Sequence, residues 1–248
     1  MNLWLMQTIY ILGALLILPV APFLYLQGRY VRRKVGLLPD AAGEKTGKFG
    51  DGEAAVRLLA IGESTVAGLG AKTHETALAG QFARVLSEKV GKSVRWHVIG
   101  KNGVTAKRAL KELVPQMPAG EKFDYIIVGL GGNDVLKLSS PLKWRRNMIK
   151  ILRVLREKHP ESVIFITNVA AVKLSPVLPE PIKFILSNLS RLHNANIKQF
   201  VRRFDNIYYY EQPATVPPDF FSDGIHPSEA GYKVWSEEII KTMSRNES

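Results

Sequence analysis

The sequence predicts an α/β fold, in which helices cover both faces of a five-stranded parallel sheet, preceded by one transmembrane helix. Three observations support this. Five strand-like segments alternate with segments of helical periodicity after residue 55. Two of those strand-like segments, 123–130 and 162–169, are almost continuously apolar, as is typical of strands buried on both faces. The third is an uncharged, mostly apolar run over residues 2–27.

The apolar run is expected to anchor the chain in a membrane. Residues 3–26 are long enough, at ~1.5 Å per residue, to cross a ~30 Å hydrocarbon core with some tilt. Pro19 and Pro22 predict a kink, which membrane helices tolerate. A cleaved signal peptide is the alternative, but no basic residue precedes the run and "PVAPFL" is a poor cleavage site. We therefore assign residues 1–28 to an uncleaved anchor.

A basic cluster follows the anchor and predicts its orientation. Arg29, Arg32, Arg33 and Lys34 would attract anionic head groups, and the positive-inside rule places them in the cytoplasm. We expect a single-pass protein of a bacterial inner membrane with its main domain facing the cytoplasm. A periplasmic domain, or one secreted after signal cleavage, is the alternative. Residues 29–55 are expected to be this basic flank and a flexible linker rich in glycine, alanine and charge.

Composition narrows the possible functions of the remaining domain, 56–248. The 248-residue chain is 46% hydrophobic and has no cysteine, which excludes disulfides, thiolate catalysis and zinc–thiolate sites. Its formal charge of +12 is compatible with nucleic acid, a membrane surface or an acidic substrate. No nucleic-acid-binding motif is present and no aromatics interleave with a basic cluster. We expect no nucleic-acid partner and interpret the charge as a solvated basic surface near a membrane.

The elements of this domain alternate in order along the chain. The expected strands are 56–61, 93–99, 123–130, 162–169 and 206–211. The expected helices are 77–90, 106–114, 143–159, 183–204 and 228–245. Right-handed crossovers would place these helices on both faces of a parallel sheet, with the ligand site beyond the carboxyl ends of the strands.

Polar and glycine-rich motifs stand at those carboxyl ends. "GEST", "GKNGVT" and "GLGGND" follow the first three strands, and "DGIHPS" precedes the final helix. Each alone has a structural explanation, such as a helix N-cap for Ser64 or a turn for "GGND". Together they supply a serine and a histidine, His226, that could act as its base. Asp223, three residues before His226, could orient the imidazole ring. They also supply possible oxyanion donors in the Ser64 N–H, the Gly103 N–H and the Asn133 amide.

These motifs resemble the four blocks of the SGNH hydrolases, the GDSL-type esterase and lipase superfamily. The resemblance runs from about residue 56 to the end of the chain, and "GGND" with "DGIHP" is its most specific part. The matching residues are Ser64 in "GES", Gly103 in "NGVT", Gly131 and Asn133 in "GGND", and Asp223 and His226 in "DGIHPS". The chain departs from the family in carrying Glu63 where aspartate usually precedes the nucleophile.

The resemblance implies a flavodoxin-like three-layer α/β/α sandwich, with no metal and no cofactor. It implies that Ser64 is the nucleophile, His226 the general base and Asp223 the residue that orients it. Ser64, Gly103 and Asn133 would form the oxyanion hole, with Gly131 in the supporting turn.

The expected function is hydrolysis of carboxylic esters, with acyl or (lyso)lipid esters near a membrane as substrates. This substrate class follows from the apolar segments 135–144 and 170–186, which are expected to border the site beside the anchor. The alternatives are a carbohydrate O-deacetylase or acetyltransferase on the same fold, and a membrane-tethered binding module without activity.

Overall fold

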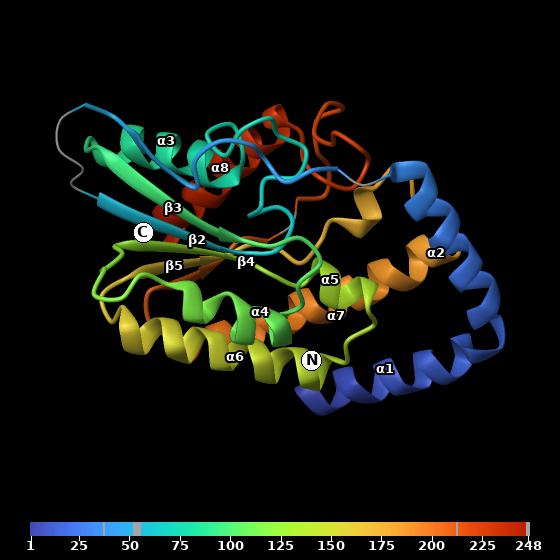
Figure 1. Cartoon of the computed structure of the whole chain (residues 1–248). Helices are drawn as coiled ribbons and strands as arrows, with labels where there is room; N and C mark the ends of the chain where they lie inside the picture. The colour runs from blue at the N-terminus through green and yellow to red at the C-terminus, as the bar shows by residue number, and fades with distance from the viewer. Residues whose placement is uncertain (37, 52–55, 212, 247–248) are drawn as a thin grey trace.

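A six-stranded sheet forms the centre of the molecule (Figure 1). The structure, a computed structural model, describes residues 1–36, 38–51, 56–211 and 213–246. The strands are β1 Thr46–Phe49, β2 Val56–Gly62, β3 Val94–Gly100, β4 Tyr125–Gly129, β5 Val163–Ile166 and β6 Ile207–Tyr209. They lie in the order β1-β3-β2-β4-β5-β6, and β2 to β6 are parallel. The five predicted parallel strands are thus confirmed, with ends shifted by up to three residues.

The expectation of five strands in total was wrong by one. β1 pairs antiparallel with β3 along the sheet edge, within the segment that we expected to be a flexible linker. Gly47 permits this pairing, because a Cβ there would lie 2.3 Å from the Trp96 indole that packs across it. β1 has only four residues, too few for a periodic sequence signal. Residues 37 and 52–55 of the expected linker lie outside the described residues.

Helices cover both faces of the sheet and complete three layers (Figure 1). One face carries α3 Leu78–Val90 and α8 Glu229–Asn246, which pack on each other. The other carries α4 Ala106–Glu112, α6 Pro141–Lys158 and α7 Ile182–Val201. The short helix α5 Gly132–Leu136 and the 3₁₀ turns η2 Val114–Gln116 and η3 Val172–Leu174 lie in the connections.

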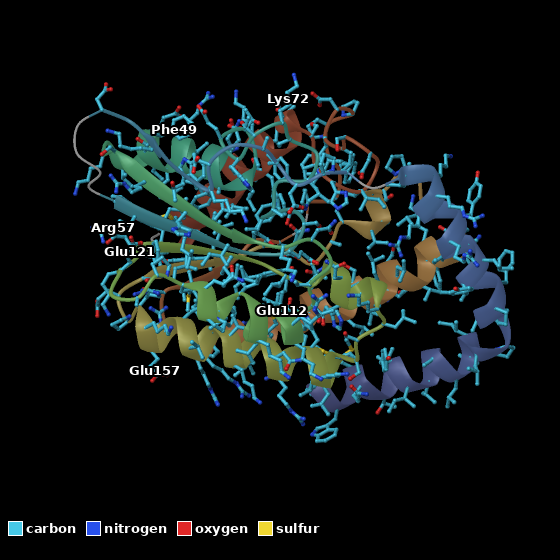
Figure 2. The ribbon with its side chains drawn as sticks, viewed as in Figure 1. Phe49, Arg57, Lys72, Glu112, Glu121 and Glu157 are labelled. Atoms are coloured by element: carbon cyan, nitrogen blue, oxygen red, sulfur yellow. The ribbon has the colours of Figure 1, made fainter. Side chains whose placement is uncertain are left out.

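Successive side chains of β2 point alternately into the two hydrophobic cores, one on each face of the sheet. Leu58 and Ala60 of β2 belong to the cluster under α3 and α8, whereas Leu59 and Ile61 belong to the cluster on the opposite face. All four side chains are fully buried, as the period of two in a strand requires. On the outside of the helical layer, Glu157 of α6 points away from the sheet (Figure 2).

The N-terminal apolar segment forms a bent pair of helices, which we call the elbow. It consists of α1 Leu3–Ile17, η1 Leu18–Val20 and α2 Ala21–Val35, with the bend at the prolines that predicted a kink (Figure 1). The segment Leu3–Val35 has the length and composition of a membrane-spanning helix, with a mean hydropathy of 2.3 over its most apolar window. A signal sequence has the same properties. α1 packs beside α6 and α7, so the elbow lies against the domain.

Three strands end at the same level and so bring their loops together. In the sheet register, Gly62 at the end of β2 is the partner of both Gly100 in β3 and Gly129 in β4. The segments that carry Ser64, Gly103 and Asn133 therefore leave the sheet side by side, as expected for carboxyl ends of parallel strands.

Candidate active site

Ser64 lies in a tight turn directly after β2. The Glu63 N–H donates to the Gly129 carbonyl at 2.8 Å, and the Val66 and Ala67 N–H groups donate back to the Glu63 carbonyl at 3.0 and 2.9 Å. Ser64 is mostly buried in this turn, with 8% of the residue's surface exposed. The next helix, α3, begins only at Leu78, so Ser64 does not act as its N-cap.

Asp223 and His226 form a hydrogen-bonded pair in the loop before α8. Asp223 Oδ2 lies 2.8 Å from His226 Nδ1, while Asp223 Oδ1 accepts the N–H groups of Ile225 and His226 at 2.8 and 2.7 Å. Burial raises the pKa of Asp223, but the hydrogen bonds from His226 and Ile225 outweigh it, and the pKa lies below its ordinary value. The carboxylate therefore stays ionised, and it fixes the imidazole by Nδ1, leaving Nε2 for other contacts.

Ser64 and His226 border one cavity of about 1910 Å³. Within the described residues no hydrogen bond joins their side chains, although catalytic hydrogen bonds are often long before substrate binds. The two loops are nevertheless held close together. At Gly70, where φ is +94°, a Cβ would lie 2.1 Å from the Pro227 carbonyl oxygen. Only glycine permits this approach of the serine loop to the histidine loop.

Asn133 and Glu63 both line the cavity and are joined by hydrogen bonds. Glu63 Oε1 accepts the Gly132 N–H at 2.6 Å, and Oε2 accepts both the Asn133 N–H at 2.8 Å and the Asn133 side-chain amide. An amide nitrogen has two hydrogens, so this contact leaves one of them for a ligand. Burial raises the pKa of Glu63 to about 7, although the donated hydrogen bonds lower it in part.

Two further backbone donors belong to residues that line the same cavity as Asn133. The N–H groups of Ser64 and Gly103 donate to no group within the part of the chain that the structure describes. Gly103 lines the cavity, whereas Gly100 is the last residue of β3 and is absent from the lining. Gly131 is the N-cap of α5 with φ +133°, and a Cβ there would lie 2.9 Å from Val169 Cγ2.

Sequence reasoning missed two residues that fix this corner. Lys137 Nζ donates to the Gly103 carbonyl at 2.8 Å, and the buried Asp134 carboxylate accepts the Ala106 N–H at 2.7 Å. Asp134 at the end of "GGND" and Lys137 at the end of α5 thus reach the loop after β3 and the start of α4. "GGND" showed Asp134 to be an acidic residue at a strand end, but no local pattern identifies its partner.

The other four histidines lie away from the cavity. Burial lowers the pKa of each, and that of His193, which stacks on Trp144 with ring centroids 4.6 Å apart, falls to about 3. The remaining three are His74, His97 and His159. His226 is thus the one histidine among the described residues that borders the cavity. No group of three or more potential metal ligands occurs within those residues.

Comparisons with known proteins agree with this arrangement. Residues 60–234 match the model of the GDSL-like Lipase/Acylhydrolase family. No curated protein matches the chain. Solved structures with the same fold include the lipase Lip_vut3 from a goat rumen metagenome, which is 20% identical with a TM-score of 0.61 over 76% of this chain and 97% of its own.

Two other structural neighbours carry different printed descriptions. A putative lipolytic protein of the G-D-S-L family from Desulfitobacterium hafniense is 15% identical, with a TM-score of 0.54 over 75% of this chain and 99% of its own. A family two carbohydrate esterase from Clostridium thermocellum is 14% identical, with a TM-score of 0.55 over 80% of this chain and 66% of its own. At these identities the likeness concerns the fold.

Proposed function

Because the chain belongs to the GDSL-like lipase/acylhydrolase family and is an ester hydrolase, we propose that it cleaves carboxylic esters through an acyl-enzyme on Ser64. The observation that carries the proposal is the 2.8 Å pair of Asp223 and His226 on the same cavity as a mostly buried serine. A nucleophilic serine needs a base, and the base needs a partner that orients it. The proposed domain that holds these residues is 56–248, to which β1 adds an edge strand, with 1–28 as anchor and the rest of 29–55 as the connecting segment.

The reaction proceeds in two acyl transfers. Ser64 Oγ attacks the ester carbonyl while His226 Nε2 takes the hydroxyl proton, and the imidazolium then gives that proton to the leaving alcohol as the C–O bond breaks. Water attacks the acyl-enzyme in the same way, its proton passes through His226 to Ser64 Oγ, and the carboxylic acid leaves. Asp223 stabilises the imidazolium in both steps and keeps Nδ1 protonated.

The developing oxyanion is stabilised by three donors. They are the N–H groups of Ser64 and Gly103 and the second amide N–H of Asn133. Removal of one such donor typically costs about 3 to 4 kcal/mol of transition-state stabilisation. Glu63 is a positioning residue here, since its carboxylate holds both the backbone and the amide of Asn133.

The acyl part of the substrate is proposed to be apolar, as in acyl or (lyso)lipid esters. The cavity is bordered by the apolar loops after β4 and β5, including Leu136, Leu138 and Leu178. A carbohydrate O-deacetylase or acetyltransferase is the second candidate, favoured by the carbohydrate esterase among the structural neighbours. Neither a metal nor a cofactor takes part in the proposed steps.

The elbow is proposed to attach the enzyme to a membrane. Its basic end, Arg29 to Lys34, would contact anionic head groups and place the domain in the cytoplasm of a bacterial cell. Reporter fusions at each end of the chain test this orientation. An alkaline phosphatase fusion at the C-terminus that is active in the periplasm would contradict it.

The Ser64→Ala variant tests the function. We expect ester hydrolysis to fall by at least about 10⁴-fold, and labelling by a fluorophosphonate to disappear, while the circular dichroism spectrum is unchanged. Ser87→Ala in α3, whose hydroxyl donates to the Lys92 carbonyl, is the matched control and should keep both. A Ser64→Ala protein with wild-type turnover of a p-nitrophenyl ester would exclude the mechanism, and a wild-type protein that neither reacts with the probe nor hydrolyses any ester would favour the inactive binding module.

A further inference from the structure

We infer that the elbow is part of the active site: α1 and α2 form the outer wall of the pocket that binds the acyl chain, and the substrates are long-chain acyl esters. This inference rests on the proposed ester hydrolysis and adds to it a wall that lies outside the family-matched residues 60–234. An anchor that merely tethered the domain would not need to contact the cavity.

Polar side chains of the elbow fix it to the domain. Tyr10 Oη donates to the Leu138 carbonyl at 2.7 Å, and Gln7 Oε1 accepts the Leu142 N–H at 3.2 Å. On α2, Gln27 Nε2 donates to the Glu180 carbonyl at 2.6 Å, while its Oε1 accepts the Ile182 N–H at 3.3 Å. Tyr10, Gln7 and Gln27 thus all bond to the domain, where lipid would leave these polar side chains unsatisfied.

One face of each elbow helix lines the catalytic cavity. On α1 these residues follow a helical spacing, with Tyr10, Gly13, Ala14 and Ile17 on the cavity side. The smallest of them widen the cavity, and a Cβ at Gly13 would meet nothing within 4 Å. On α2 the lining includes Leu24, Gly28 and Val31. The cavity that begins at Ser64 therefore continues along the elbow.

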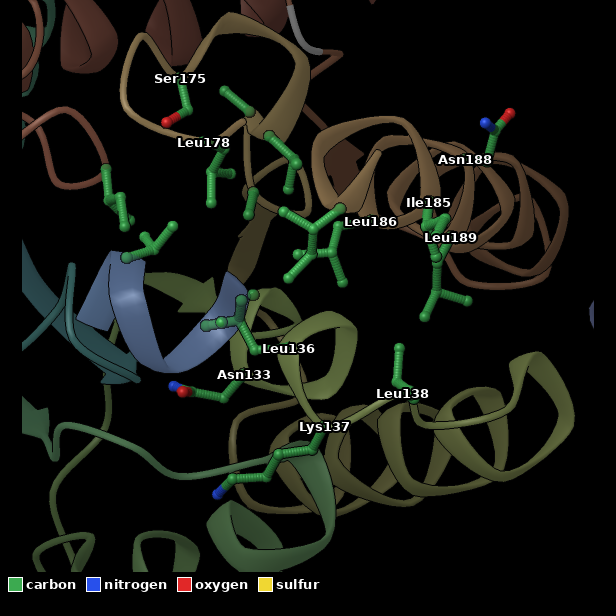
Figure 3. Close-up of a pocket in the computed structure, with 18 of the residues that line it drawn as sticks. Asn133, Leu136, Lys137, Leu138, Ser175, Leu178, Ile185, Leu186, Asn188 and Leu189 are labelled. Carbon is green, nitrogen blue, oxygen red and sulfur yellow. The ribbon is translucent and has the colours of Figure 1, made fainter. Parts of the chain in front are cut away.

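The opposite wall of this space is also apolar. Leu136 follows β4, Leu178 follows β5, and Leu186 and Leu189 belong to α7. In Figure 3, Leu136, Leu178 and Leu186 point into one space from three separate segments. Besides the serine, histidine and asparagine, the polar groups of the lining include Arg29 and Arg32 of α2 and Arg191 of α7.

Two apolar walls beside the polar catalytic residues match an ester with a polar reacting group and a long apolar tail. The carbonyl is held among Ser64, His226 and Asn133, and the tail lies between the elbow and α7. Each methylene buried there favours binding, so discrimination should grow with chain length. A short acyl group would reach the catalytic residues without touching the elbow.

The absence of cysteine from the chain permits a selective test. Ala14→Cys places one thiol on the cavity face of α1, and Leu15→Cys places one on the adjacent exposed position that does not line the cavity. The full-length variants, in detergent, are modified with benzyl methanethiosulfonate, assayed on p-nitrophenyl acetate and palmitate, and then treated with dithiothreitol. Dithiothreitol removes the benzyl group, so recovered activity shows that the fold was intact.

We expect modified Ala14→Cys to lose about 10- to 50-fold in kcat/KM on palmitate, to keep its activity on acetate, and to recover with dithiothreitol. Modified Leu15→Cys should resemble the unmodified protein on both esters. An unchanged ratio of palmitate to acetate activity after modification of Ala14→Cys would overturn the inference, as would a wild-type enzyme that hydrolyses acetate but not palmitate. Both of these leave ester hydrolysis in place, whereas the absence of all Ser64-dependent hydrolysis refutes the proposed function itself.

Discussion

Replacement of Glu63 by glutamine tests how the buried carboxylate supports the site. In the wild type this side chain accepts three hydrogen bonds, two from the Asn133 backbone and amide and one from Gly132. A glutamine amide brings an NH₂ group against at least one of these donors. The loss of a hydrogen bond to a charged acceptor costs about 1.5 to 3 kcal/mol. If Asn133 loses its position, kcat should fall by roughly 10- to 100-fold.

The same substitution changes how stability depends on pH. Burial raises the pKa of Glu63 from 4.5 to about 7 in the folded chain. A group whose pKa is higher in the folded chain than in the unfolded chain stabilises the fold fully at a pH below its unfolded pKa. This stabilisation is lost as the pH rises through its folded pKa. At about 1.4 kcal/mol per pH unit, the difference between the unfolded and folded pKa values of Glu63 corresponds to about 3 kcal/mol of unfolding free energy. Glutamine does not titrate and removes this dependence.

The assay is denaturant unfolding of both proteins in detergent, below pH 4.5 and above pH 7. The free energy of unfolding of the wild type, relative to Glu63→Gln, should fall by about 3 kcal/mol between these conditions. Glu88→Gln, which removes an exposed carboxylate from the Arg84 pair, should show no such difference. If the stabilities of wild type and Glu63→Gln change in parallel over this range, Glu63 does not have the raised pKa and the reasoning is wrong.

Two further substitutions test the catalytic loops. Asp223→Asn should lower kcat by about 10³- to 10⁴-fold with little change in KM, because the amide no longer stabilises the imidazolium of His226. A kcat within threefold of the wild-type value in steady-state assays would contradict the role of Asp223. Gly70→Ala should cost more than about 2 kcal/mol in unfolding assays and also lower kcat, because its Cβ would lie 2.1 Å from the Pro227 oxygen. Gly91→Ala is the control: Gly91 also has a positive φ, but a Cβ there would meet nothing within 4 Å, so this substitution should cost only about 1 kcal/mol of stability. Equal losses of stability at Gly70 and Gly91 would count against a close approach of the two loops.

The five parallel strands could be predicted because their signals are local. Apolar runs such as 123–130 end at glycine-rich turns, and the alternation with helices leaves few topologies. β1 could not be predicted, because an edge strand of four residues is stabilised by its pairing with β3 and by packing against Trp96. Residues 46–49 carry no local pattern that indicates either contact. The start of α3 at Leu78 agrees with the expected helix 77–90, and the segment between the serine turn and α3 folds back on itself through bonds such as that from the Leu69 N–H to the Ser64 carbonyl.

The residues at the carboxyl ends of the strands, and with them the candidate serine, histidine, aspartate and asparagine, could be read from the order of the motifs along the chain. Parallel pairing guarantees that such ends meet, so order along the chain was enough. Three other features follow from how distant elements pack: Glu63 holds Asn133, Lys137 holds Gly103, and the elbow lines the cavity. These contacts join distant parts of the chain, such as Tyr10 and Leu138, which are 128 residues apart. No periodicity encodes such a partner, because it depends on how whole elements pack.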